Sequence, residues 1–178
     1  MNRIRGPEPS AGRPFRGLAA ALALALSLTG CGYYVSGMGG KLPEGVTTIS
    51  IPMFENGTSK PDIEGILTTA FVKEFNTTVQ VVNDAEVEVK GRIKVYSLVP
   101  VSFTESDINQ EYRLTVVLSL AVFRGGEVLW RDDGVTDYED FVVNEADVAA
   151  TRKAEEKALK KLARDTARLV KERIMEDF

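Results

Sequence analysis

The stretch EYRLTVVLSLAVF, residues 111–123, decides the fold, because apolar side chains recur at every second position from Tyr112 to Val122. Alternation with a period of two is the signature of a strand with one buried face. The tetrapeptide RGGE at residues 124–127 then predicts a tight hairpin turn, with the chain returning as a strand through VLWR and on to Phe141. We therefore expect a long antiparallel hairpin at the centre of the protein.

A third long strand is predicted just before this hairpin. Residues 87–95 alternate between an apolar or small set and a polar set, which predicts a half-buried strand with a wet face. Shorter strands are expected at 46–54 and 79–82, with a turn at 55–58 and a polar loop between Pro100 and Asn109. The apolar set is Val87, Val89, Gly91, Ile93 and Val95, and the polar set is Glu88, Lys90, Arg92 and Lys94.

Two amphipathic helices complete the pattern. The first is predicted to be capped by Ser59, and the second to be capped by Asn144 and to run to about Met175. The order is then β-α-β-β-β-β-α, which predicts a single small α+β domain whose antiparallel or mixed sheet carries both helices on one face. The apolar stripe of the first helix is Ile63, Ile66, Leu67, Ala70, Phe71 and Phe75, and that of the second is Val148, Ala158, Leu159, Leu162, Leu169, Val170 and Ile174.

The N-terminus has the layout of a bacterial lipoprotein signal. A basic leader and a short apolar run precede LTGC at residues 28–31, and Cys31 is the only cysteine of the chain. We predict a signal peptide over residues 1–30, lipidation of Cys31, a flexible tether over 31–45 and a domain over 46–178. The apolar run is too short for a spanning helix, so the membrane is reached through the lipid anchor. An ordinary signal peptide with a cysteine nearby by chance is the alternative.

Composition argues against several functions. The chain has no histidine, and acylated Cys31 would leave no thiol, so the commonest general base, metal ligand and nucleophile are missing. The leader holds four of the 22 basic residues and only one of the 26 acidic residues. The mature part is therefore more acidic than the whole chain, whose net charge is −4. Such a surface is a poor partner for nucleic acid. We expect the protein not to be an enzyme and to bind no cofactor or metal. The number of carboxylates does not exclude a glycosidase with a pair of catalytic acids, but the pattern around Asp132 and Asp133 indicates solvated side chains.

Several blocks of sequence together resemble a known family across essentially the whole mature chain. They are Cys31-Gly32-Tyr33; then Val46, Ile49, Ile51-Pro52, Phe54, Asn56, Thr58, Pro61, Ile63-Glu64 and Leu67-Thr68; then Glu111-Tyr112-Arg113-Leu114 and Val128-Leu129-Trp130. The spacing of these blocks is similar to that of the lipopolysaccharide (LPS)-assembly lipoprotein family, LptE.

This resemblance implies a small sheet with two helices on one face and a non-enzymatic role. Family members plug the outer-membrane β-barrel of the LPS translocon, assist its folding and bind LPS on its way to the outer leaflet. The implied partners are the barrel protein and LPS, and the implied location is the periplasmic side of the outer membrane, which Gly32 after the lipidated cysteine also favours. The alternatives are a lipoprotein that regulates a peptidoglycan synthase or another envelope complex, and a tethered hydrolase.

The residues themselves offer candidate contacts. Lys90, Arg92 and Lys94 fall at every second position of a predicted strand and form a basic row, and Arg113 sits on the wet side of the next strand. Such a row could meet lipid A phosphates through charge-assisted hydrogen bonds. An ordinary solvated strand face is the plainer interpretation. Phe103, in the polar loop, is a candidate barrel contact.

Overall fold

The computed structural model describes residues 46–102, 109–144 and 146–177. The predicted signal peptide, Cys31, the tether and Phe103 lie outside these residues. Among the residues it does describe, no helix is both long enough and apolar enough to cross a membrane.

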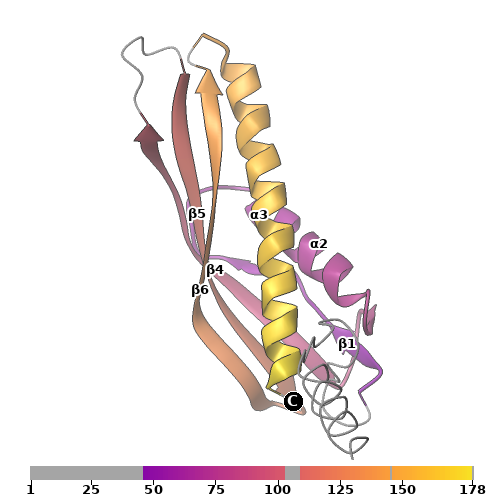
Figure 1. The fold of residues 1–178 in the computed structure, drawn as a ribbon. Helices are drawn as coiled ribbons and strands as arrows, with labels where there is room; N and C mark the ends of the chain where they lie inside the picture. Colours follow the sequence, from indigo (N-terminus) through magenta and orange to yellow (C-terminus); the bar gives the residue numbers. More distant parts are fainter. Residues whose placement is uncertain (1–45, 103–108, 145, 178) are drawn as a thin grey trace, which may run out of the picture. The chain divides into compact units, whose positions relative to one another are not determined.

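The domain is built on a mixed six-stranded sheet (Figure 1). Its strands lie in the order β3-β1-β4-β5-β6, and β2 pairs with β4 beyond the end of β1. The pairs β4–β5 and β5–β6 are antiparallel and the short strands pair in parallel, so the predicted α+β fold is confirmed. The bounds are β1 Thr48–Ser50, β2 Glu55–Asn56, β3 Gln80–Val82, β4 Val87–Ser102, β5 Asn109–Arg124 and β6 Glu127–Asn144.

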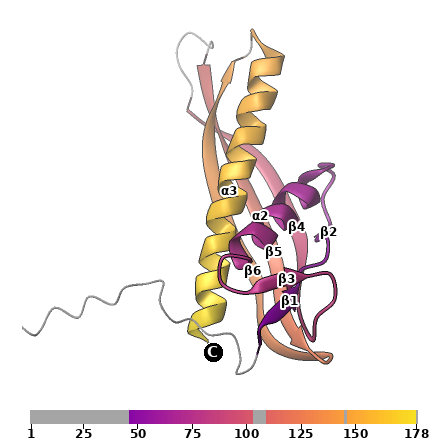
Figure 2. The ribbon, with the colours of Figure 1, turned by 90° about the vertical axis from the view of Figure 1, so that its right-hand side faces the viewer.

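Two helices cover one face of the sheet (Figure 2). Helix α2 spans Ile63–Phe75 and packs against α3, which spans Val148–Glu176 and runs along β6. The two-residue strand β2 lies where a turn was predicted, and the other elements follow the predicted order. Two residues assigned to the apolar stripe of α3 are instead exposed: Val148 at its first turn and Leu169.

Both helices begin later than predicted. The N-cap of α2 is Asp62, in the left-handed region at φ 66° and with no side-chain capping bond, so Ser59 precedes the helix. The N-cap of α3 is Asp147, whose side chain accepts a hydrogen bond from the Ala150 N–H at 2.9 Å. Asn144 instead ends β6 and accepts from the Ala146 N–H, so it shapes the turn before the helix.

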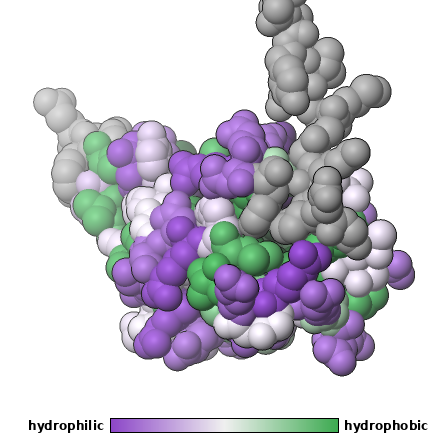
Figure 3. Space-filling model, turned by 90° about the horizontal axis from the view of Figure 1, so that it is seen from below, coloured by the Kyte–Doolittle hydropathy of each residue, from purple (hydrophilic) through white to green (hydrophobic). Residues whose placement is uncertain are grey.

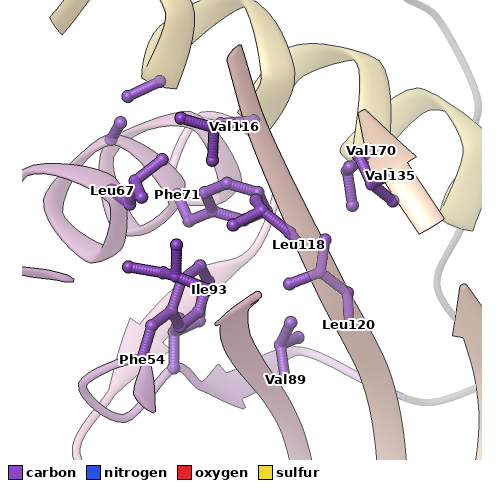
Figure 4. Close-up of a cluster of buried hydrophobic side chains, with 14 of the residues drawn as sticks. Phe54, Leu67, Phe71, Val89, Ile93, Val116, Leu118, Leu120, Val135 and Val170 are labelled. Carbon is purple, nitrogen blue, oxygen red and sulfur yellow. The ribbon is translucent and has the colours of Figure 1, made fainter. Parts of the chain in front are cut away.

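The core lies between the helices and the sheet (Figure 4). Phe54 and Phe71 meet edge to face with ring centroids 4.9 Å apart, and the branched residues of β4 and β5 fill the space around them. The alternating apolar residues predicted to be buried on residues 111–123 are buried, except that Tyr112 is only partly so. Burial of this continuous cluster is the main stabilising contribution to such a domain.

A register shift on β4 corrects one prediction. Pairing with β5 slips between Ile93 and Val95, so Lys94 is an extra residue and Tyr96 takes the inward position opposite Val116. Val95, which alternation placed on the buried face, is 42% exposed. Beyond this bulge the two faces of β4 are exchanged relative to the predicted pattern.

Asn56 organises the turn between β2 and α2. Its amide nitrogen donates to the Lys60 carbonyl and to the Glu64 carboxylate, both at 2.8 Å. Its amide oxygen accepts from the Thr58 N–H at 2.9 Å and from the Thr58 hydroxyl at 2.8 Å. The Asn56, Thr58 and Glu64 spacing that carried the resemblance is therefore a folding motif, which fixes the entry to α2.

Candidate functional site

The face of the sheet opposite the helices carries a basic depression, which we call the basic trough. It is about 530 Å³ in volume and is lined by Gly57, Arg92, Lys94, Ser119, Arg131 and Asp133. Arg92 and Lys94 come from β4 and Arg131 from β6, so cations flank the small Ser119 of the central strand β5 from both sides. Lys94 lies two positions after Arg92 and therefore on the same face, and it is the extra residue of the bulge in β4.

Hydrogen bonds inside the basic trough centre on Asp133. Its carboxylate accepts from the Ser119 hydroxyl at 2.5 Å and from the Arg131 Nε–H at 2.8 Å. Its carbonyl oxygen accepts from the Lys94 ammonium at 3.1 Å. The residue therefore links all three strands across the trough and holds Lys94 and Arg131 in position.

The charges of the basic trough are only partly balanced. Arg92 pairs with Glu55 at 3.3 Å and Arg131 with Asp133 at 2.8 Å, whereas Lys94 contacts a neutral carbonyl. The hydrogen bonds from Arg131 and Ser119 hold the pKa of Asp133 below its usual value, and the same bond raises the pKa of Arg131. A positive charge is left over in an otherwise acidic domain. Arginine and lysine side chains so placed can bind phosphate oxygens.

Lys90 lies beside the basic trough rather than in its lining. It is opposite Ala121 in the register, and Ala121 is opposite Arg131 on β6. Its ammonium is 2.7 Å from the Glu88 carboxylate and 5.3 Å from the centre of the Phe123 ring. The structure thus brings the predicted basic row onto one face, with Lys90 paired to Glu88.

Arg113 lies elsewhere on the same face. Six positions separate it from Ser119 along β5, or roughly 20 Å. It makes two hydrogen bonds of 2.8 Å to the Asp140 carboxylate and stacks 4.1 Å above the Tyr138 ring. These bonds raise the pKa of Arg113 and lower that of Asp140. Arg113 is therefore not part of the basic trough, and its contact with LPS stays a prediction.

Sequence reasoning missed Arg131, Ser119 and Asp133. The hairpin turn at 124–127 fixes which residues of β5 and β6 face each other, but two register shifts follow it, between Val122 and Phe123 and between Leu118 and Leu120. Each shift moves every later pair by one residue. No local sequence signal gives the position of both shifts, so the residue opposite Ser119 could not be identified.

A second depression, of about 410 Å³, lies at the end of the domain where α3 finishes. There the Trp130 indole N–H donates to the Asp177 carboxylate at 2.9 Å, and Arg173 reaches Asp132 at 3.2 Å. Figure 3 views this end of the domain and shows a mainly hydrophilic surface with smaller hydrophobic patches. The bonds of Trp130 and Arg173 tie the last turn of α3 to β6.

Across the described ranges, no cluster of three or more acidic, histidine or cysteine residues is arranged to hold a metal ion.

A family model described as LptE, lipopolysaccharide-assembly, matches residues 46–174. A comparison with curated protein sequences found no match.

The chain is also similar to solved structures of bacterial lipoproteins. Lipoprotein B from Nitrosomonas europaea is 15% identical, with a TM-score of 0.50, and the match covers 81% of this chain and 90% of that one. A minor lipoprotein from Acinetobacter baumannii is 18% identical, with a TM-score of 0.45 and coverage of 75% and 94%. At these identities the likeness to lipoprotein B concerns the fold alone.

Proposed function

This chain belongs to the LptE lipopolysaccharide-assembly family, and from that premise we propose that it is a lipid-anchored plug of the LPS translocon barrel. In this role it helps the barrel to assemble and assists delivery of LPS to the outer leaflet. Cys31 would carry the lipid and hold the domain at the periplasmic side of the outer membrane. The domain acts by binding and takes no part in covalent chemistry.

The observation that supports direct LPS contact is the basic trough. Arg92, Lys94 and Arg131 approach one depression from two strands, over the small side chain of Ser119. Lipid A carries phosphate groups, and a guanidinium offers two parallel donors to a phosphate while an ammonium supplies a compact charge. We propose that the trough binds a lipid A phosphate, with Lys90 contributing at its edge.

The surrounding acidity gives this site its selectivity. The whole chain carries a net charge of −4, so a general attraction for polyanions is unfavourable. An anion would bind only where cations outnumber carboxylates locally. Binding at the trough should therefore be sensitive to individual side chains and weaken as salt screens the exposed charges.

Neutralising the trough tests the LPS contact. Replacing Arg92, Lys94 and Arg131 together by glutamine should lower the affinity of the purified lipoprotein for LPS at least about tenfold, since each charged contact contributes roughly 1 kcal/mol or more. A matched triple variant at Lys153, Lys157 and Arg164, exposed on α3, removes the same charge and should bind as the wild type does. Equal affinity of both variants would remove the trough as the LPS site.

A pull-down tests the plug role separately. The tagged full-length lipoprotein, recovered from detergent-solubilised envelopes, should bring down a heat-modifiable β-barrel of translocon size in stoichiometric amount. Recovery of a peptidoglycan synthase in place of the barrel would favour the regulator alternative. Recovery of neither protein would also contradict the plug.

A further inference from the structure

One edge of β4 pairs with two short strands along its first half and with no strand of the described residues along its second half. β1 pairs with Val87 and Glu88, and β2 pairs with Arg92 and Ile93, both in parallel. From Val95 to Val101 the described part of the chain supplies no further strand on that edge, while β5 continues to pair on the other side. Unpaired backbone N–H and C=O groups in a row form a template for another strand.

The open edge of β4 differs in charge from the edge at the other side of the sheet. Residues 95–101 read VYSLVPV and hold no charged side chain. β6, which forms the far edge, carries Arg131, Asp132, Asp133, Asp137, Glu139 and Asp140. Charges on an edge strand discourage pairing with other chains, so β6 is protected and β4 is not. Pairing is limited at the far end of the open edge, where Pro100 lacks an N–H and a register shift between Pro100 and Ser102 makes Val101 an extra residue.

Apolar side chains are exposed on both faces of this open segment. Val99 is 51% exposed on the face opposite the helices, where it is in register with Arg113. Leu98 is 39% exposed on the helix side, where it is in register with buried Leu114. Val95 and Val101 are each 42% exposed. A strand added here would gain backbone hydrogen bonds and cover apolar surface on both of its faces.

We propose that residues 95–101 receive an extended, uncharged segment of the translocon barrel protein, which continues the sheet as an additional strand. This inference rests on the proposed function, because it takes the barrel as the partner. Two features of the edge support it: β1 and β2 already pair with β4 on this same edge, so the edge accepts added strands, and an uncharged edge imposes no repulsion on an uncharged strand.

Other occupants fit less well. A second copy of this chain would bring together two domains that each carry net negative charge. The segment preceding β1 enters the sheet beside Val87, at the opposite end of β4 from Val101, because β1 and β4 run in parallel. Amide hydrogen exchange distinguishes both of these occupants from the barrel segment.

Amide hydrogen exchange on the full-length lipoprotein, alone and in the purified barrel complex, tests the proposal. We expect the edge amides of residues 95–101 to exchange at least about tenfold more slowly in the complex, because new backbone bonds protect them. The edge amides of β6 serve as the internal control and should not change. If the amides of residues 95–101 exchange slowly already in the monomeric lipoprotein, its own N-terminal segment covers the edge. If they become protected only when the lipoprotein self-associates, a second copy of the chain covers it. Either result overturns the proposal.

A pair of variants makes the test independent of exchange. Val101→Lys places a charge on the open edge and should reduce recovery of the barrel severalfold, whereas Val128→Lys, at a similarly exposed valine of β6, should not. Thermal unfolding of both variants checks that each domain remains folded. Full barrel recovery with Val101→Lys would overturn the strand addition and leave the plug role intact, while absence of the barrel from the wild-type preparation would contradict both.

Discussion

The Lys60 ammonium lies 2.6 Å from a carboxylate oxygen of Glu155, and this ion pair joins the segment before α2 to the second turn of α3. The Tyr96 hydroxyl donates to the same oxygen at 2.5 Å, so β4 is tied to the pair as well. Burial alone would raise the pKa of Glu155, but the hydrogen bonds from Lys60 and Tyr96 outweigh it and the pKa is lowered. Burial and the bond to Glu155 raise the pKa of Tyr96.

The stability contributed by Glu155 should depend on pH. Its folded pKa lies below the ordinary 4.5, so the contribution is fully present above that pH and is lost as pH falls through the folded pKa. At pH 7, Glu155→Gln should lower the free energy of unfolding by roughly 1 kcal/mol, a modest value because Lys60 is partly exposed. Denaturant unfolding of both proteins between pH 7 and pH 3 should show the gap closing below about pH 4.5. A gap that widens on acidification would contradict this account.

Gly91 has no room for a side chain. A Cβ at this position would meet the Phe54 ring at 2.7 Å and 2.8 Å, and that ring is buried in the core. Gly91→Ala should therefore lower the free energy of unfolding by about 1–3 kcal/mol, as overpacking of a core does. Gly65→Ala, in α2 with no atom within 4 Å, is the control and should raise it by about 0.5–1 kcal/mol. Thermal denaturation measures both, and equal effects would refute the packing argument.

Thr68 connects α2 to the chain before it. Its buried hydroxyl accepts from the Phe54 N–H at 3.0 Å and donates to the Glu64 carbonyl at 2.6 Å. Thr68→Val keeps the shape but leaves the Phe54 N–H without this partner, so we expect a loss of about 1–3 kcal/mol in unfolding free energy. Thr69→Val, on the exposed side of the same helix, should change it by less than about 0.5 kcal/mol. If chemical denaturation finds the two variants alike, the hydrogen bond is not stabilising.

Lipidation of Cys31 predicts a specific chemical product. Mass spectrometry of the mature protein from a Gram-negative host should find an acylated N-terminal peptide beginning at this residue. Cys31→Ser should abolish the modification and release the domain from the membrane fraction, since the acyl chains provide the anchor. An unmodified wild-type Cys31, or a mature N-terminus at another residue, would favour the ordinary signal peptide.

The sequence predicted the fold well because side-chain periodicity reports directly on burial. Residues 111–123 and the two helical stripes each bury one face, so their patterns carried the order of elements and the two-layer arrangement. Bulges break this relation, since one extra residue exchanges the faces of all that follow. The prediction put Val95 on the wrong face for that reason. It started α2 too early because Asn56 holds the preceding turn through side-chain hydrogen bonds, which the pattern of helix-capping residues does not indicate.

The candidate site was predictable only in part. Lys90, Arg92 and Lys94 lie on one strand, so their common face followed from spacing. The contribution of Arg131 depends on how β6 is aligned with β5, which two register shifts determine. Whether a basic side chain is available for a ligand also depends on its ion-pair partner. Arg113 pairs with Asp140, a residue 27 positions away. Contacts between distant segments set the site, and local patterns do not encode them.

The close approach of Phe54 and Gly91 has a consequence for how this family can diverge. As long as the ring occupies position 54, a mutation that adds a side chain at position 91 is costly. A smaller residue at position 54 opens the required space first. Along a lineage the two positions should therefore change in that order, and in related chains a large side chain at one should accompany a small one at the other.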